Sequence, residues 1–135
     1  MIEIYTDGAS RGNPGESASS FVFVKEGIAF KFSSFYLGKA TNNIAEYKAI
    51  IFALRDALSS GFKEVLLTSD SELVISQING KYKVKAEHLK LLAKEVSELS
   101  ERFSEIEFRH RKRENKFVRI ADKLCNLMLD SVCLR

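Results

Sequence analysis

Apolar and polar residues alternate at 2–6 and again at 28–33, and a mostly apolar run fills 18–24. Alternation with a period of two is typical of strands, so three strands are expected here, at 2–6, 18–24 and 28–37. Residues 25–27 have the composition of a hairpin turn. The chain is therefore predicted to begin with an antiparallel three-stranded meander, and Asp7-Gly8 is expected to end its first strand.

The later segments carry apolar residues at helical spacing, separated by short apolar runs. Thr41-Asn42-Asn43 supplies side chains that commonly cap the start of a helix. The expected elements are helices at 44–59, 72–79, 86–102 and 120–132, and strands at 65–67 and 106–108. The resulting order, β-β-β-α-β-α-α-β-α, predicts an α/β fold with a mixed five-stranded sheet and helices on both faces.

Length and composition favour one globular domain spanning residues 1–135. Hydrophobic residues make up 45% of the chain and charged residues 29%, which suits a domain that buries a core. The apolar run at 49–54 is too short to cross a membrane. No obligatory protein partner is evident, so a monomer is expected.

Two further features concern the cellular compartment. Met1 leads directly into the first strand, so no signal peptide is expected. Cys125 and Cys133 fall eight residues apart on a predicted helix, roughly 12 Å at 1.5 Å per residue, which is too far for a disulfide. Reduced thiols and the absence of a signal peptide together favour a cytoplasmic protein.

Glu46 is the most informative single residue of the predicted helix at 44–59. It shares a helical face with positions 49, 50, 53, 54 and 57, which hold Ala, Ile, Ala, Leu and Ala. A carboxylate on a face that packs against a sheet is costly unless it is paired or binds a metal ion. The alternative is a glutamate at the margin of the apolar stripe that reaches water.

Asp7 and Asp70 each follow a predicted strand. Each also has an ordinary structural explanation, as an Asp-Gly turn and as a helix N-cap. If the two strands are adjacent and parallel, both side chains lie at the same edge of the sheet, beside Glu46. Convergent carboxylates repel one another, and two divalent cations, Mg²⁺ or Mn²⁺, would relieve that repulsion. Paired cations of this kind are used for phosphodiester hydrolysis.

Four segments of the chain, 5–15, 41–46, 69–71 and 114–124, resemble the signature segments of type 1 ribonuclease H, in the right order. The resemblance implies a ribonuclease H-like fold and Mg²⁺-dependent endonucleolytic cleavage of the RNA strand of RNA–DNA hybrids. It also implies that Asp7, Glu46, Asp70 and Asp122 are the catalytic metal ligands. Glu114 and Asp130 are the other acidic candidates for the fourth ligand, and Asp122 is preferred because it is expected near the start of the last helix.

The resemblance also implies contacts with the hybrid. Asn13, Asn42 and Asn43 match positions that meet the minor groove, where 2′-hydroxyl groups identify RNA. Thr41 matches a contact to a DNA phosphate. Thr41, Asn42 and Asn43 are also explained by helix capping alone, and both roles are compatible.

A basic segment at 109–119 leads to Asp122, and Arg111, Lys112 and Arg113 within it are expected to contact phosphates. A solvated basic surface is the alternative. His110 is the nearest match to a mobile-loop histidine that assists product release in the family, although the spacing differs. Only residues 81–85 remain of the basic protrusion that some members carry.

Two other functions share some of these features. A metal-dependent exonuclease of related fold would place Asp-x-Glu on the first strand, whereas this chain has Asp7-Gly8-Ala9. A non-catalytic duplex-binding module would keep the basic segment but would not need four carboxylates. The glycines do not have the spacing of a nucleotide-binding loop.

Overall fold

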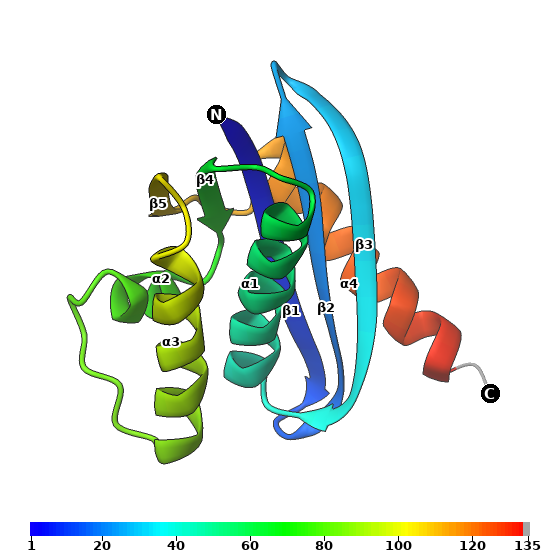
Figure 1. Ribbon diagram of the computed structural model, residues 1–135. Coiled ribbons are helices and arrows are strands. Elements are labelled where there is room, and N and C mark those ends of the chain that lie inside the picture. Colours follow the sequence, from blue (N-terminus) through cyan, green and yellow to red (C-terminus); the bar gives the residue numbers. More distant parts are fainter. Residues whose placement is uncertain (134–135) are drawn as a thin grey trace.

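A mixed five-stranded sheet lies at the centre of the computed structural model, which describes residues 1–133 (Figure 1). Its strands, in the spatial order β3-β2-β1-β4-β5, are β1 (Ile2–Gly12), β2 (Gly15–Lys25), β3 (Ile28–Ala40), β4 (Glu64–Ser69) and β5 (Glu105–His110). The first three strands are antiparallel, and β4 runs parallel to both β1 and β5. The predicted mixed sheet and the adjacency of the strands leading to Asp7 and Asp70 are confirmed.

Helices cover both faces of this sheet. They are α1 (Asn42–Ser59), α2 (Glu72–Ile78), α3 (Glu87–Ser100) and α4 (Lys116–Cys133). Figure 1 shows α1 and α3 side by side on one face, with α4 crossing the other face behind β1 to β3. None of the helices in residues 1–133 is both long and apolar enough to cross a membrane.

The main core lies between α1, α3 and the sheet. The face of α1 predicted to be apolar is fully buried, and it packs against side chains such as Ile4, Phe21 and Leu67 from the strands. Burying a side chain of this size contributes roughly 1.5–3 kcal/mol, so this contact fixes the position of α1 on the sheet.

A smaller core lies under α4. Val118, Ala121, Cys125 and Leu129 follow one another at helical spacing and are all buried against the strands. Cys125 is buried within this core, and Cys133 is exposed.

The first strand does not end at Asp7-Gly8, and that prediction is wrong. β1 continues to Gly12 because β2 pairs with it along its whole length, with Asp7 opposite Ser20. The strand that ends beside the site is β4, whose last pair with β1 is Thr6 with Ser69. Asp7 therefore lies one residue beyond the end of the parallel pairing and not at the tip of its own strand.

The predicted basic loop at 109–119 is also much shorter. β5 extends to His110, which pairs with Ser69, and α4 begins at Lys116. The helix starts early because the Asn115 side chain accepts hydrogen bonds from the backbone N–H groups of the next turn. His110 thus lies on a strand, and Asp122 lies in the second turn of α4 rather than at its start.

Candidate active site

Gly8 brings β1 and α1 into direct backbone contact. A Cβ atom at this position would lie 2.2 Å from the carbonyl carbon of Ala45 and 2.3 Å from the nitrogen of Glu46, so only glycine fits. The Gly8 N–H donates a hydrogen bond of 2.5 Å to Oε1 of Glu46, and the Ser19 hydroxyl donates one of 2.7 Å to the carbonyl of Ala45. These contacts hold Glu46 rigidly beside Asp7.

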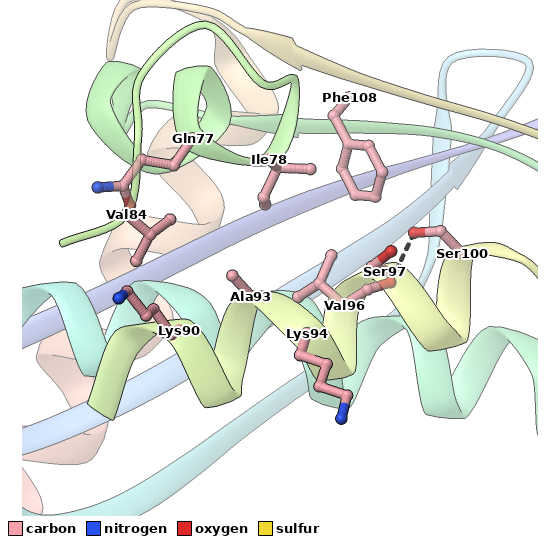
Figure 2. A pocket seen from close by; sticks show the side chains of 10 residues that line it. All are labelled: Gln77, Ile78, Val84, Lys90, Ala93, Lys94, Val96, Ser97, Ser100 and Phe108. Carbon is pink, nitrogen blue, oxygen red and sulfur yellow. Dashed lines mark hydrogen bonds between the residues drawn. The ribbon is translucent and has the colours of Figure 1, made fainter. Parts of the chain in front are cut away.

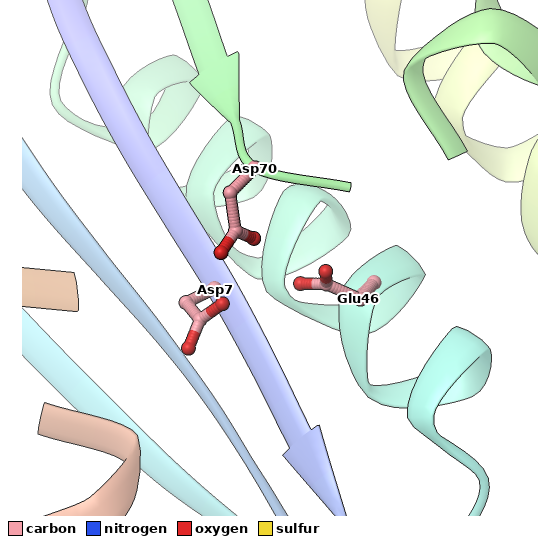
Figure 3. Close-up of side chains that lie close together, drawn as sticks. All are labelled: Asp7, Glu46 and Asp70. Carbon is pink, nitrogen blue, oxygen red and sulfur yellow. The ribbon is translucent and has the colours of Figure 1, made fainter. Parts of the chain in front are cut away.

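Three carboxylates from different elements converge at this point. Asp7 on β1, Glu46 on α1 and Asp70 directly after β4 each offer an oxygen atom, and these atoms lie within 4.8 Å of one another. Figure 3 shows the side chains of Glu46 and Asp70 extending toward the strand that carries Asp7. The structure thus brings together the three ligands predicted from separate sequence segments.

Burial and mutual repulsion make this cluster difficult to ionise. Asp7 is 3% exposed and Glu46 is 4% exposed. Burial, followed by the negative charges of Asp70 and Asp122, raises the pKa of Asp7 to about 8. Burial and then the charge of Asp7 also raise the pKa of Glu46 well above its usual range. A nearby positive charge opposes both shifts.

Asp122 joins the same cavity from α4. The cavity has a volume of ≈ 240 Å³, and its lining includes all four predicted metal ligands together with Asn42, Ser71 and Arg113. Asp122 is not part of the 4.8 Å cluster, and Glu114 does not line the cavity at all. The side chain of Asp130 pairs with Arg11 instead. Of the three acidic candidates, the structure therefore favours Asp122.

The site fits divalent cations by its own geometry. Oδ2 of Asp7 is buried and has no hydrogen-bond partner among the described residues, which is unusual for a carboxylate. The surrounding donors are carboxylate oxygens, the hard ligands that Mg²⁺ and Mn²⁺ prefer. Asp7, Glu46 and Asp70 could hold such ions, and Asp122 could contribute from the open side.

The residues predicted to meet the hybrid surround the start of α1. Thr41 is the N-cap of α1, and its hydroxyl accepts a hydrogen bond of 3.2 Å from the N–H of Ile44. The side-chain oxygen of Asn13, in the β1–β2 turn, accepts a hydrogen bond of 3.1 Å from the N–H of Asn42. Asn42 is exposed and lines the carboxylate cavity, and Asn43 is next to it. Capping is therefore observed, and contact with a hybrid remains a prediction.

In the basic segment, three predicted residues lie away from the carboxylates, and one lies closer than expected. His110, Arg111 and Lys112 do not line the cavity, and the Arg111 guanidinium donates a hydrogen bond to the carbonyl of His110. Arg113, expected only as a phosphate contact, forms ion pairs with Asp70 and Asp122. Sequence reasoning missed this pairing and the role of Gly8, because neither leaves a periodic signal.

A second hollow, of ≈ 440 Å³, lies between α2, α3 and β5 (Figure 2). Ile78, Val84, Val96 and Phe108 make its walls mainly apolar, and Lys90 and Lys94 are among its lining residues. Its lining contains no carboxylate, histidine or cysteine, unlike that of the carboxylate cavity.

Comparison with known proteins agrees with this geometry. The family model described as reverse transcriptase-like matches residues 5–128. Ribonuclease HI of Halobacterium salinarum is 37% identical over 96% of this chain and 64% of that protein. The crystal structure of ribonuclease H1 from the same archaeon superimposes with a TM-score of 0.92, covering 96% of this chain and 98% of that one.

Two further proteins extend the comparison. LC11-RNase H1, isolated from compost and crystallised in complex with an RNA/DNA hybrid, is 40% identical, with a TM-score of 0.91 over 98% of this chain and 99% of that one. The bifunctional protein Rv2228c of Mycobacterium tuberculosis is 34% identical over 96% of this chain. The chain spans only 36% of the length of that relative. The chain belongs to the reverse transcriptase-like family. It has the ribonuclease H1 fold, in agreement with the four segments that resemble type 1 ribonuclease H.

Proposed function

We propose that this protein is a metal-dependent endoribonuclease that hydrolyses the RNA strand of RNA–DNA hybrids. The convergence of Asp7, Glu46 and Asp70 within 4.8 Å is the observation that carries the proposal. Relatives named ribonuclease HI and ribonuclease H1 support it, as does the hybrid bound to LC11-RNase H1. The catalytic unit would be the single domain of residues 1–135, acting as a cytoplasmic monomer.

Asp7, Glu46, Asp70 and Asp122 would hold two Mg²⁺ or Mn²⁺ ions. When bound, such ions activate the attacking water and stabilise the leaving oxygen of a phosphodiester. A carboxylate oxygen of Asp7 lies within 4.8 Å of those of Glu46 and Asp70, and Oδ2 of Asp7 has no hydrogen-bond partner among the described residues, so Asp7 is well placed to bind a cation.

The chain prepares this arrangement before any ligand arrives. Glu46 is held in place by the Gly8 N–H and buried among apolar neighbours, so little reorganisation is needed when it binds a cation. Asp70 follows β4, whose parallel pairing with β1 sets its distance from Asp7. The rigid sheet and helix thus hold the carboxylates at positions that suit the proposed role.

Substrate selection would depend on the start of α1 and the adjoining turn. The hydrogen bond from the Asn42 N–H to Asn13 ties these two segments together, next to the carboxylate cavity. Asn13, Asn42 and Asn43 would read the 2′-hydroxyl groups of the RNA strand, and Thr41 would contact a phosphate of the DNA strand. Arg111 and Lys112, both exposed beyond β5, would contact phosphates on the other flank, close to His110.

Cleavage of a hybrid labelled at one end of its RNA strand tests the proposal. In Mg²⁺ we expect the RNA strand to be cut at internal positions and the DNA strand to stay intact. In EDTA we expect no products. Stepwise shortening from an end would indicate the exonuclease, and binding without cleavage would indicate the duplex-binding module. Either of those results would overturn the proposal, as would equal cutting of a DNA duplex.

A further inference from the structure

Arg113 occupies an unusual position for a residue in an exposed loop. Its side chain is 68% exposed, yet the guanidinium reaches two of the metal-ligand candidates. Nε lies 3.5 Å from Oδ2 of Asp70, and Nη2 lies 3.9 Å from Oδ1 of Asp122. One side chain therefore bridges the carboxylates that come from β4 and from α4.

The charge balance of the cavity depends on this residue. Among the nine residues that line the cavity, four are acidic and only Arg113 is basic. Its positive charge opposes the rise in the pKa of Asp7 and of Glu46, although burial dominates both. The carboxylates in turn raise the pKa of Arg113, with Asp122 contributing most. The guanidinium thus acts as a counter-ion to the cluster.

A bound cation would compete with Arg113 for the negative charge of Asp70 and Asp122. A guanidinium and a divalent cation close to the same carboxylates would also repel each other. Glu46 and Asp7 are fixed by the packed core, whereas Arg113 lies on the short segment between β5 and α4 and is largely exposed. When the two positive groups compete, the exposed side chain is the one that can move.

We propose that Arg113 is a built-in counter-ion that pairs with Asp70 and Asp122 in the metal-free protein and is displaced when divalent cations bind, so that it sets the cation affinity. This inference rests on the proposed function of the same site. The planar guanidinium suits the role because it can face two carboxylates at once, which the single ammonium group of lysine does less well.

Isothermal titration with Mn²⁺ alone tests the inference in four proteins: wild type, Arg113→Gln, Arg113→Lys and Lys123→Gln. The matched control is Lys123, which is exposed next to Asp122 and forms no ion pair within residues 1–133. Arg113→Gln is expected to bind Mn²⁺ about fivefold more tightly, the scale of one exposed ion pair. Arg113→Lys should lie between that variant and wild type. Lys123→Gln should change the Mn²⁺ affinity by less than about twofold, because a solvated charge is well screened.

Thermal unfolding provides a second readout. An ion pair that only stabilised the fold would affect Tm equally with and without Mn²⁺. Arg113→Gln should lower Tm in EDTA, where the carboxylates lose their counter-ion, and should not lower it in saturating Mn²⁺. A Tm lowered equally in both conditions would overturn the inference. Unchanged or weaker Mn²⁺ binding by Arg113→Gln would also overturn it, as would the absence of Mn²⁺ binding in every protein.

Hybrid cleavage measured on the same preparations separates this inference from the proposed function. If wild type cleaves the hybrid but Arg113→Gln binds Mn²⁺ with wild-type affinity, only the inference fails. If Arg113→Gln binds Mn²⁺ more tightly but no protein cleaves the hybrid, only the proposed function fails.

Discussion

The carboxylate site has two unlike halves. The inner pair, Asp7 and Glu46, is almost fully buried and is locked by the backbone contact at Gly8. The outer pair, Asp70 and Asp122, has side chains that are 12% and 27% exposed, and Arg113 contacts both. The inner half is rigid and forms no direct ion pair within residues 1–133, whereas the outer half is open and pairs directly with Arg113.

This difference separates two tasks within one site. Rigid ligands hold catalytic geometry well, but burying their charge destabilises the metal-free fold. Open ligands with a mobile counter-ion cost less to keep ionised and adjust more easily to a cation. We expect the inner pair to decide whether the protein is active, and the outer pair to decide how firmly cations are held.

The largest effect is expected from Asp7→Asn. Loss of the central ligand should reduce kcat by at least about 10³-fold, more than the 10–100-fold typical of groups that only support a ligand. Hybrid binding, measured in Ca²⁺, should change little because Asp7 is buried below the surface. If Asp7→Asn kept a tenth of the wild-type kcat, the claim that the inner pair decides activity would be wrong.

Gly8→Ala should damage the inner half without removing a ligand. The added Cβ would collide with the backbone of Ala45 and Glu46, so we expect unfolding free energy to fall by about 3 kcal/mol and activity to fall with it. Gly38→Ala is the matched control, because Gly38 has a positive φ but open space around it. Its cost should be about 1 kcal/mol in urea unfolding. Equal losses would show that the close approach of β1 and α1 is not critical.

Asp122→Asn tests the outer half. We expect kcat in Mg²⁺ to fall by about 10–100-fold, less than for Asp7→Asn, because Asp122 lies at the open side of the cavity and outside the 4.8 Å cluster. Hybrid binding should barely change, and Mn²⁺ should partly restore kcat. Glu114→Gln, which lies outside the cavity, is the control and should remain active. Steady-state kinetics of the two variants would contradict this assignment if Glu114→Gln were the inactive one.

The smallest effect is the dependence of metal-free stability on pH. The pKa of Asp7 is about 8 in the folded protein, above the value of about 3.9 expected when unfolded. This raised pKa favours folding most below about pH 4, and the contribution is lost as pH rises through 8. In EDTA, Tm should therefore fall between pH 5 and 8, and Asp7→Asn should flatten the fall. If the wild-type Tm rose across this range, ionisation of the buried Asp7 would not destabilise the metal-free protein, contrary to this account.

Much of the fold and three of the four candidate ligands could be predicted because local sequence patterns surround them. Glu46 stands out because helical spacing places a carboxylate on a face of alanine, isoleucine and leucine, and Glu46 is indeed buried. Asp7 and Asp70 stand out because each follows a run of strand-forming residues. Their convergence required only that β1 and β4 be parallel neighbours, as they are.

The features that sequence patterns could not supply depend on contacts between distant segments. β1 continues past Asp7 because β2 pairs with it, and α4 starts early because Asn115 caps it. The sequence shows that Gly8 follows Asp7, but not that the backbone of α1 packs against it. Arg113 resembles its basic neighbours along the chain, and only the fold selects it as the residue that meets Asp70 and Asp122.

The most direct test of the central claim is a titration of Mg²⁺ into EDTA-treated protein, with cleavage of a labelled RNA–DNA hybrid as the readout. If the four carboxylates hold catalytic cations, RNA-strand cleavage should be absent at first, should appear as Mg²⁺ is added, and should remain absent in Asp7→Asn at every concentration. Ca²⁺ should bind without supporting cleavage, because its looser coordination does not enforce the required geometry. Vigorous cleavage in EDTA, or an Asp7→Asn variant as active as wild type, would contradict the claim.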